Sequence, residues 1–128
     1  MYKLLQNQAV SNLHNEINKL GWGAAAEQYP EVKAHFDATM GADKFSNTYI
    51  KFYTMVAEID VSDVEEAFHV HNIQDESKIT RYGTQHSMSV GDILVAEDGG
   101  MYFCDRYGFS YIGQDTKEYT IPARSVIA

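Results

Sequence analysis

The sequence predicts an α+β fold in which N-terminal helices pack on a mostly antiparallel, strongly twisted sheet or small open barrel. Three observations lead to this fold class. The chain has 128 residues and is 45% hydrophobic, which suits one domain with a substantial core. The spacing of its apolar residues changes near residue 46, from helical to alternating. An Asp-Gly turn then separates two apolar runs, which is typical of a β-hairpin. We therefore treat residues 1–128 as a single domain with a helical part, 1–46, and a strand-rich part, 47–128.

The helical part contains two regions with apolar residues at helical spacing. The first region ends at Gly21, and its apolar stripe consists of Val10, Leu13, Ile17 and Leu20. The second region ends at Gly41, with Pro30 suited to a first helical turn. Its apolar stripe consists of Val32, Phe36 and Met40. The first residues, MYKLL, are also compatible with a strand.

The strand-rich part opens with a segment, residues 48–60, that is rich in aromatic and β-branched residues. It contains no Gly or Pro, so we predict one long strand. A short helix is predicted over residues 60–70, with Ser62 and Glu65 forming a capping box at its start. We expect this helix to bury Val64, Ala67 and Phe68.

A β-hairpin is predicted around Asp98 and Gly99, with strands over residues 92–97 and 101–108. Residues 109–112 and 118–127 add one or two further strands, and Pro122 places the last at a sheet edge. The segment before the hairpin, His86 to Asp92, is not a phosphate-binding loop, because one Gly precedes a strand and no Lys follows. We expect it to build the fold, with Asp92 bonded to the backbone of the turn and Ser87 and Ser89 acting as loop hydrogen-bonders.

The charge of the chain limits its partners. The formal net charge is −8, which disfavours direct binding of nucleic acid or of an anionic membrane and favours a partner with a basic surface. No apolar run is long enough to span a bilayer and no leader peptide is expected, so we expect a cytoplasmic protein. The single cysteine excludes an intrachain disulfide and a Cys-based zinc site. No cofactor is predicted.

Histidines and the cysteine are the candidates for chemistry. His69 and His71 form an H-x-H pair that, on a strand, would bring both rings to one face for a metal, with His86, Asp105 or Cys104 completing the site. At a helix end, the same pair would complement the helix dipole instead. Cys104 is either a nucleophile that needs a basic partner or a small buried hydrophobe. A small metal- or Cys-dependent enzyme is therefore the alternative function, and we favour a protein without catalytic residues.

A run of carboxylates without Lys or Arg is the strongest charge feature. It consists of Glu58, Asp60, Asp63, Glu65, Glu66, Asp75 and Glu76. One interpretation is a solvated helix face with good capping residues. The other is an acidic docking surface for a basic partner, because such a surface steers and selects partners by charge.

Aromatic residues near the hairpin form a second candidate surface. Tyr49, Tyr53, Tyr102, Tyr107, Phe109 and Tyr111 cannot all be fully buried in so small a core. Some of them are core residues. We expect Tyr102, Tyr107, Phe109 and Tyr111 to form a half-exposed patch suited to a protein interface, where Tyr and Phe are enriched.

Part of the strand-rich half resembles the YodL-like small domain of phages and mobile genetic elements. The resemblance covers about residues 49–112 and follows a strand, an acidic short helix, the pattern H-S-x-S-V-x-D-I-L-V, an Asp-Gly turn and an aromatic strand ending in Gly-Phe. Its residues are His86, Ser87, Ser89, Val90, Asp92, Ile93, Leu94, Val95, Asp98, Gly99, Tyr102, Gly108 and Phe109. The resemblance implies no catalytic residues.

The resemblance also implies a biological context, that of a small accessory protein acting in the host cytoplasm. Together with the acidic and aromatic surfaces, this predicts a non-enzymatic phage or mobile-element protein that binds a host protein. A nucleic-acid-handling or defence protein is the expected target, for example in host takeover or anti-defence. A virion-associated structural protein is a further alternative.

Overall fold

The computed structural model describes residues 1–122, and it begins with a strand followed by four helices. These elements are β1 (Tyr2–Asn7), α1 (Ala9–Asn12), α2 (His14–Leu20), α3 (Trp22–Gln28) and α4 (Pro30–Thr39). The middle of the chain holds a 3-10 helix η1 (Asn47–Phe52), β2 (Tyr53–Ile59), α5 (Val64–Asn72) and a second 3-10 helix η2 (Glu76–Lys78). The last strands are β3 (Ile79–Arg81), β4 (Ile93–Ala96), β5 (Gly100–Asp105) and β6 (Gly108–Gln114).

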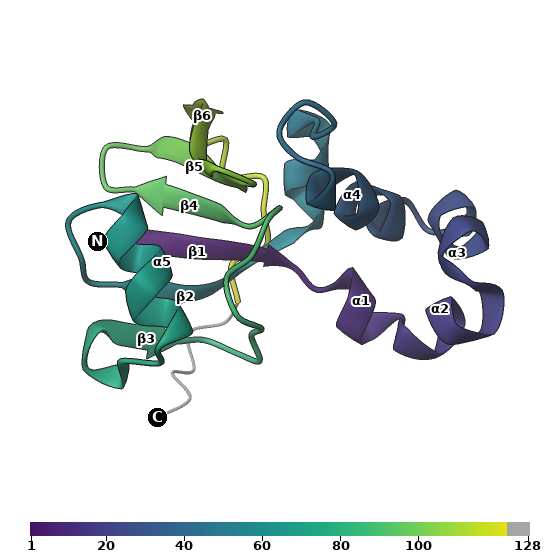
Figure 1. Cartoon of the computed structure of the whole chain (residues 1–128), viewed down its shortest axis with the longest axis horizontal. Helices are drawn as coiled ribbons and strands as arrows, with labels where there is room; N and C mark the ends of the chain where they lie inside the picture. Colours follow the sequence, from purple (N-terminus) through teal and green to yellow (C-terminus); the bar gives the residue numbers. More distant parts are fainter. Residues whose placement is uncertain (123–128) are drawn as a thin grey trace.

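The strands form one six-stranded antiparallel sheet with the order β3-β2-β1-β4-β5-β6. The sheet is open, so the α+β prediction with a twisted sheet is confirmed and the alternative of a small barrel is not adopted. β1 lies in the centre, between β2 and β4. Helices α1 to α4 extend from one end of the sheet as a helical arm, while α5 packs across a sheet face (Figure 1).

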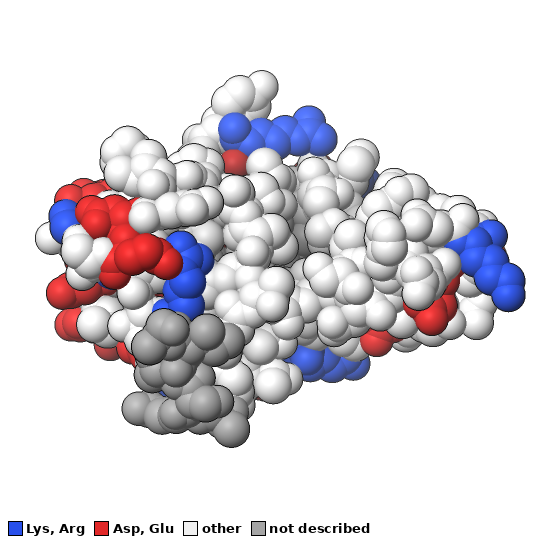
Figure 2. All heavy atoms as spheres, turned by 90° about the horizontal axis from the view of Figure 1, so that it is seen from below, with Lys and Arg blue, Asp and Glu red and all other residues white. Residues whose placement is uncertain are grey.

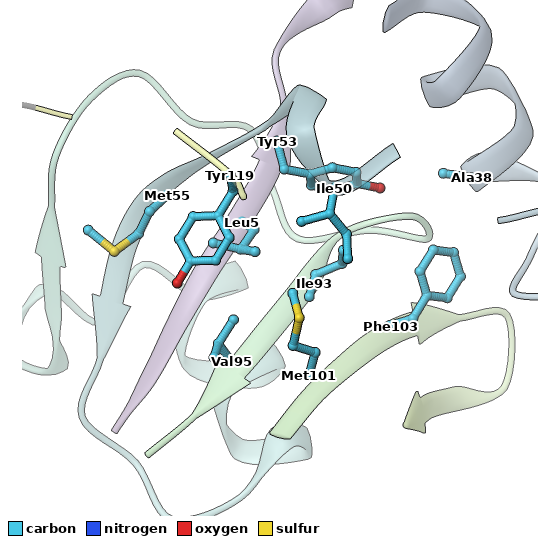
Figure 3. Packing of buried hydrophobic residues seen from close by; sticks show 10 residues of the cluster. All are labelled: Leu5, Ala38, Ile50, Tyr53, Met55, Ile93, Val95, Met101, Phe103 and Tyr119. Atoms are coloured by element: carbon cyan, nitrogen blue, oxygen red, sulfur yellow. The ribbon is translucent and has the colours of Figure 1, made fainter. Parts of the chain in front are cut away.

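The inner strands of the sheet contribute buried residues to both of its faces. Neighbouring residues of a strand point to opposite faces, and in β1 Leu4 and Leu5 accordingly belong to different core clusters. The cluster shown in Figure 3 lies between the sheet, α4 and η1, and it consists of Leu5, Ala38, Ile50, Tyr53, Met55, Ile93, Val95, Met101, Phe103 and Tyr119. On the other face, Ala67 and Val70 of α5 pack on Leu4 and Leu94. Because β1 is covered on both sides, its position in the core is strongly specified.

The helical arm differs from the prediction in its breaks and in its buried face. The first predicted helix is divided at Leu13 and the second at Tyr29. In α4, Val32, Ala34 and Ala38 are buried, whereas Phe36 and Met40 are each 45% exposed. The prediction of an inward stripe through Phe36 and Met40 was therefore wrong. Small alanines face inward because α4 approaches the sheet closely, and a Cβ at Gly91 would lie 3.2 Å from the Cβ of Ala38.

The long strand predicted for residues 48–60 begins only at Tyr53. Residues 47–52 form η1, where the Ser46 hydroxyl accepts a hydrogen bond from the backbone N–H of Thr48 at 3.3 Å. This turn places Ile50 in the core, at 1% exposure. The β-branched and aromatic residues of this segment therefore serve core packing rather than strand pairing.

Helix α5 confirms the predicted short helix but starts one residue later than its capping box implied. Its N-cap is Asp63, whose carboxylate accepts from the backbone N–H of Glu66 at 2.7 Å. The buried residues are Ala67, Val70 and His71, and the prediction that Phe68 is buried was wrong, since it is 36% exposed. The face that α5 buries is decided by its packing on Leu4 and Leu94 of the sheet.

The hairpin and the following strand are as predicted, while the described part of the last predicted strand, residues 118–122, forms one bridge. β4 and β5 flank the turn at Asp98 and Gly99, where Gly99 has a φ of 89°. Thr120 forms a single parallel bridge with Thr54, and residues 123–127 of that prediction lie outside the described residues. Within residues 1–122, none of the helices has both the length and the apolar character that crossing a membrane requires.

Candidate functional site: an aromatic face beside an acidic end

Most carboxylates of the acidic run gather at one end of the sheet. The end of β2, the start of β1 and the end of β4 meet there, because Tyr2 pairs with both Ile59 and Ala96. The β4–β5 turn adds two carboxylates that the sequence analysis did not include. We call this the acidic end, and its members are Glu58, Asp60, Asp63, Glu65, Glu66, Glu97 and Asp98. Figure 2 shows red atoms concentrated at the end of the molecule opposite the helical arm.

Two shallow hollows open at the acidic end and contain a minority of lysines. One is lined by Glu58, Glu97, Asp98 and Asp115 together with Lys3 and Lys117. The other is lined by Asp60, Glu66, Glu97 and Asp98 together with Lys78. Carboxylates outnumber lysines in both hollows, so this end attracts cationic groups.

Two members of the predicted acidic run lie elsewhere, near η2 beyond the C-terminal end of α5. The Asp75 carboxylate accepts hydrogen bonds from the hydroxyl of Ser77 at 2.6 Å and from its backbone N–H at 3.2 Å. Glu76 binds Arg81 through two guanidinium nitrogens, with Nε–Oε1 at 2.6 Å and Nη2–Oε2 at 2.8 Å. The hydrogen bonds from Ser77 and Arg81 lower the pKa of each carboxylate below its ordinary value. Both groups therefore serve local structure, and the structure does not bring them to the acidic end.

Aromatic side chains lie on the sheet face that carries α5. Leu94 pairs with Tyr102, and Tyr102 pairs with Tyr111, so the three side chains share a face across neighbouring strands. The rings of Tyr102 and Tyr111 pack edge-on with centroids 5.6 Å apart, and those of Phe68 and Phe109 do so at 6.4 Å. We call Tyr2, Phe68, Tyr102, Phe109 and Tyr111 the aromatic face.

The aromatic face is contiguous with the acidic end. Tyr2 lines one of the hollows of the acidic end together with Glu66 and Asp98. Its pKa is raised first by burial and then by the charges of Tyr102, Asp63, Asp98 and Glu65. A Cβ at Gly100 would lie 3.1 Å from the ring of Tyr102 and 3.2 Å from Oδ1 of Asp98. Gly100 thus allows the ring and the carboxylate to lie side by side. The result is a ring-lined surface with carboxylates along one border.

The predicted aromatic patch is divided in the structure. Tyr111 is 57% exposed and belongs to the aromatic face, with its hydroxyl accepting a hydrogen bond from Nε2 of Gln114 at 2.8 Å. Tyr107 is fully exposed at the β5–β6 turn and borders a different hollow, beside Met40 and Lys44. Tyr53 is buried, and its hydroxyl donates to the carbonyl oxygen of Gly91. Sequence analysis did not identify Tyr2 and Phe68 as surface residues, because the role of Tyr2 depends on strand pairing and that of Phe68 on how α5 packs on the sheet.

The structure does not bring the histidines and the cysteine of the alternative enzyme together as one group, since His71 and His86 line one hollow whereas His69 and Cys104 lie outside it. His69 is exposed in the last turn of α5, while His71 is buried with Nε2 2.7 Å from Oε1 of Gln85. Cys104 lies in β5 at 4% exposure, and burial raises the pKa of its thiol to about 12. Over the part of the chain that the structure describes, no three His, Cys, Asp or Glu side chains are arranged to hold a metal ion.

A buried polar cluster attaches the loop before β4 to the central strand. Asp92 is 5% exposed, and its Oδ2 accepts from Nε2 of Gln6 and from the backbone N–H of Ser89, both at 3.0 Å. Gln6 also donates to the carbonyl oxygen of His86 at 2.9 Å. The expected bond of Asp92 to the turn backbone is confirmed. Gln6 was missed because a buried glutamine gives no local signal in sequence.

Burial is the main influence on the Asp92 carboxyl. It raises the pKa to about 7, against the opposing effects of His86, the Ser89 N–H and Gln6. His86 Nδ1 lies 4.0 Å from Oδ2 of Asp92 and 2.8 Å from the carbonyl oxygen of Ser87. These contacts lie within the fold, so the segment from His86 to Asp92 has a structural role of the kind expected.

No protein-family model matches the chain, and neither the curated proteins nor the solved structures that were compared give a significant match.

Proposed function

We propose that the chain is a non-enzymatic accessory protein of a phage or mobile genetic element that binds a host protein with a basic surface. The acidic end and the aromatic face together form the binding surface. The observation that carries this proposal is the position of Tyr2, which packs on the same core cluster as Phe109 and lines one hollow of the acidic end together with Glu66 and Asp98. One continuous surface therefore carries both carboxylates that attract cations and aromatic rings that a partner can bury.

The two parts of the surface supply different components of binding. Exposed carboxylates increase the association rate of a basic partner and exclude acidic ones. Aromatic side chains supply most of the contact energy of protein interfaces, because they bury large areas at small entropic cost. Lysine and arginine side chains also bind directly over aromatic rings. The surface therefore suits a partner that presents Lys or Arg among apolar residues.

The class of host protein follows from the same chemistry. Proteins that bind DNA or RNA carry clusters of Lys and Arg that neutralise phosphates. An acidic surface with adjoining rings would bind such a cluster and block its access to nucleic acid. We therefore propose a nucleic-acid-handling or defence protein of the host as the target, and the host cytoplasm as the place of action.

The first test is an affinity pull-down of the tagged protein from bacterial lysate at low and high salt. The proposal expects a specific partner whose capture decreases as salt rises, because exposed charges are screened within about 8–10 Å at physiological ionic strength. A partner that persists at high salt would assign most of the binding to the aromatic face. Absence of any specific partner under both conditions would contradict the proposal.

A matched pair of variants tests whether the captured partner binds at the acidic end. The test variant combines Asp63→Asn, Glu65→Gln and Asp98→Asn, which removes three charges beside Tyr2. The control combines Glu16→Gln, Glu27→Gln and Glu31→Gln, which removes three charges from the helical arm. We expect the test variant to lose the partner and the control to retain it. Equal loss in both would show that net charge, and not this surface, determines capture.

A further inference from the structure

The two edges of the sheet differ in their protection against a further strand. β3 forms one edge, is three residues long, contains Arg81 and directly follows Lys78. Short length and charged residues are the usual means by which proteins prevent pairing at an edge. β6 forms the other edge, is seven residues long with the sequence GFSYIGQ, and contains no charged residue and no proline. The β6 edge thus lacks the protection that the β3 edge has.

The accessible part of the β6 edge lies beside the aromatic face. Nδ2 of Asn47 donates to the carbonyl oxygen of Ile112 at 3.2 Å, and the strand is irregular opposite Met101 and Tyr102, so the C-terminal part of the edge is partly covered. The regular part covers residues 108–111. Within residues 1–122, β5 is the one strand that pairs with β6. In a ladder, alternate residues present their N–H and C=O groups to the outer side.

The side chains beside this edge indicate the chemistry of an added strand. Phe109 and Tyr111 are two residues apart and therefore point to the same face, which is the aromatic face. Side chains of an added strand would lie beside these rings, where Lys and Arg make favourable contacts. Carboxylates of the acidic end adjoin this face at the C-terminal end of β6, because Gly100, which follows the turn at Asp98, pairs with Gln114. A second copy of this chain is disfavoured because each copy has a net charge of −8.

We infer that β6 binds an extended segment of the partner as an additional strand, and that this segment alternates Lys or Arg with apolar residues. This inference depends on the proposed function, for which it supplies the binding mode. In strand addition, main-chain hydrogen bonds give affinity and alternate side chains give specificity. The basic side chains would lie over Phe109 and Tyr111, and the other row of side chains would lie on the opposite sheet face.

The probe for the test is the synthetic peptide acetyl-Lys-Val-Arg-Val-Lys-Val-Arg-Val-amide, measured against the full chain by fluorescence anisotropy. Two further peptides carry backbone N-methyl groups, one on its valines and one on its Lys and Arg residues. Charge and side chains are the same in all three. Strand addition uses the N–H groups of alternate residues, so one methylated peptide should bind about tenfold or more weakly and the other about as well as the parent. Hydrogen exchange of amides in residues 108–111 should slow on binding.

The outcomes separate this inference from the proposed function. Equal binding by all three peptides would show docking by side chains alone, which overturns strand addition and leaves the proposed function standing. Equal loss with both methylated peptides, or no protection of residues 108–111, would also overturn it. Failure of the parent peptide to bind would overturn it as well, while the pull-down decides the proposed function independently. If sedimentation experiments showed a dimer that forms through β6, the inference would also be overturned, because the added strand would then come from a second copy of this chain and not from a basic segment of a partner.

Discussion

Asp92 is the residue whose chemistry depends most on its surroundings. Its carboxyl is buried beside Gln6 and His86, and the phenol of Tyr53 and the thiol of Cys104 face it from β2 and β5. The pKa is raised from 3.8 in the unfolded chain to about 7 in the folded protein. The protonated form is thus favoured by folding. Its contribution to stability is fully present below the unfolded pKa and is lost as the pH rises through about 7.

The Asp92→Asn variant tests this linkage, because an amide remains neutral at every pH of the experiment. We expect the free energy of unfolding of the variant, relative to the parent chain, to increase between about pH 5 and pH 8 by a few kcal/mol, following the conversion of a pKa shift into free energy. Urea denaturation at several pH values measures this difference. His86→Ala serves as a control, since loss of a side chain that lowers the pKa of Asp92 should move the transition of this carboxyl to higher pH. If the difference in free energy of unfolding between the variant and the parent chain did not change with pH, the raised pKa of Asp92 would be contradicted.

Cys104 provides a second prediction at the scale of one residue. The thiol is 4% exposed, and its pKa of about 12 keeps it protonated near neutral pH. Only the thiolate reacts with disulfide reagents, so we expect very slow reaction with Ellman's reagent in the folded protein and rapid reaction in denaturant. Ser11→Cys adds an exposed thiol on α1 as an internal standard. If Cys104 reacted as fast as that standard, the result would contradict this prediction and support the alternative hypothesis of a Cys-dependent enzyme.

Helix α5 combines a structural and an electrostatic role in one side chain at its start. The Asp63 carboxylate caps the helix by accepting from the N–H of Glu66 at 2.7 Å, and the Glu66 carboxylate accepts from the N–H of Ser62 at 3.1 Å. Asp63 also contributes charge beside Tyr2. The acidic character of this segment therefore has a folding function as well as the binding function that we propose.

Two substitutions separate these roles. Asp63→Ala removes both cap and charge and should lower the free energy of unfolding by about 1 kcal/mol. Asp63→Asn keeps an oxygen that can cap, so its stability should stay within a few tenths of a kcal/mol of the parent, while capture of a basic partner decreases. Thermal unfolding and the pull-down measure the two effects. Equal destabilisation by both substitutions would show that charge on the helix dipole, and not the hydrogen bond, determines the stability of this end.

Elements whose signals are local could be predicted, and elements that depend on distant partners could not. The Asp98-Gly99 turn predicted the β4–β5 hairpin because positive φ at Gly99 is a local requirement. The central position of β1 has no such signal. Its last residues, Gln6 and Asn7, are polar but buried, and Gln6 is satisfied by His86 and Asp92, about 80 residues away.

The candidate site was predictable in its residue types but not in its boundaries. The carboxylates from Glu58 to Glu66 and the rings of Tyr102, Phe109 and Tyr111 were visible in the sequence. That the carboxylates and the rings form one surface depends on the strand register, because the pairing of Tyr2 with Ile59 and Ala96 places it next to both groups. The same pairing brings Glu97 and Asp98 to the acidic end. A charge count along the chain could not exclude Asp75 and Glu76, because it does not show their local partners.

The whole molecule consists of a densely packed sheet and a helical arm with a smaller core. The core cluster of the arm contains Ala9, Ile17, Ala25 and Val32, of which two are alanines. Burial of an alanine contributes far less than burial of the leucine, phenylalanine and methionine side chains that fill the sheet clusters. α4 joins the two parts, because Val32 packs in the arm and Ala38 packs against the sheet. The arm is therefore expected to open at a lower free energy than the sheet.

The chain contains one reporter for each part, which allows a direct test. Trp22, the single tryptophan, is in the arm and stacks on His35 with ring centroids 6.2 Å apart. Cys104, the single cysteine, is in the sheet. On titration with urea, we expect the fluorescence of Trp22 to change at lower concentration than the accessibility of Cys104. Ala25→Gly, which weakens α3 by about 1 kcal/mol, should move the first transition and leave the second in place. Coincident transitions in both proteins would show that arm and sheet unfold as one cooperative unit, and that α4 couples them more tightly than their separate cores imply.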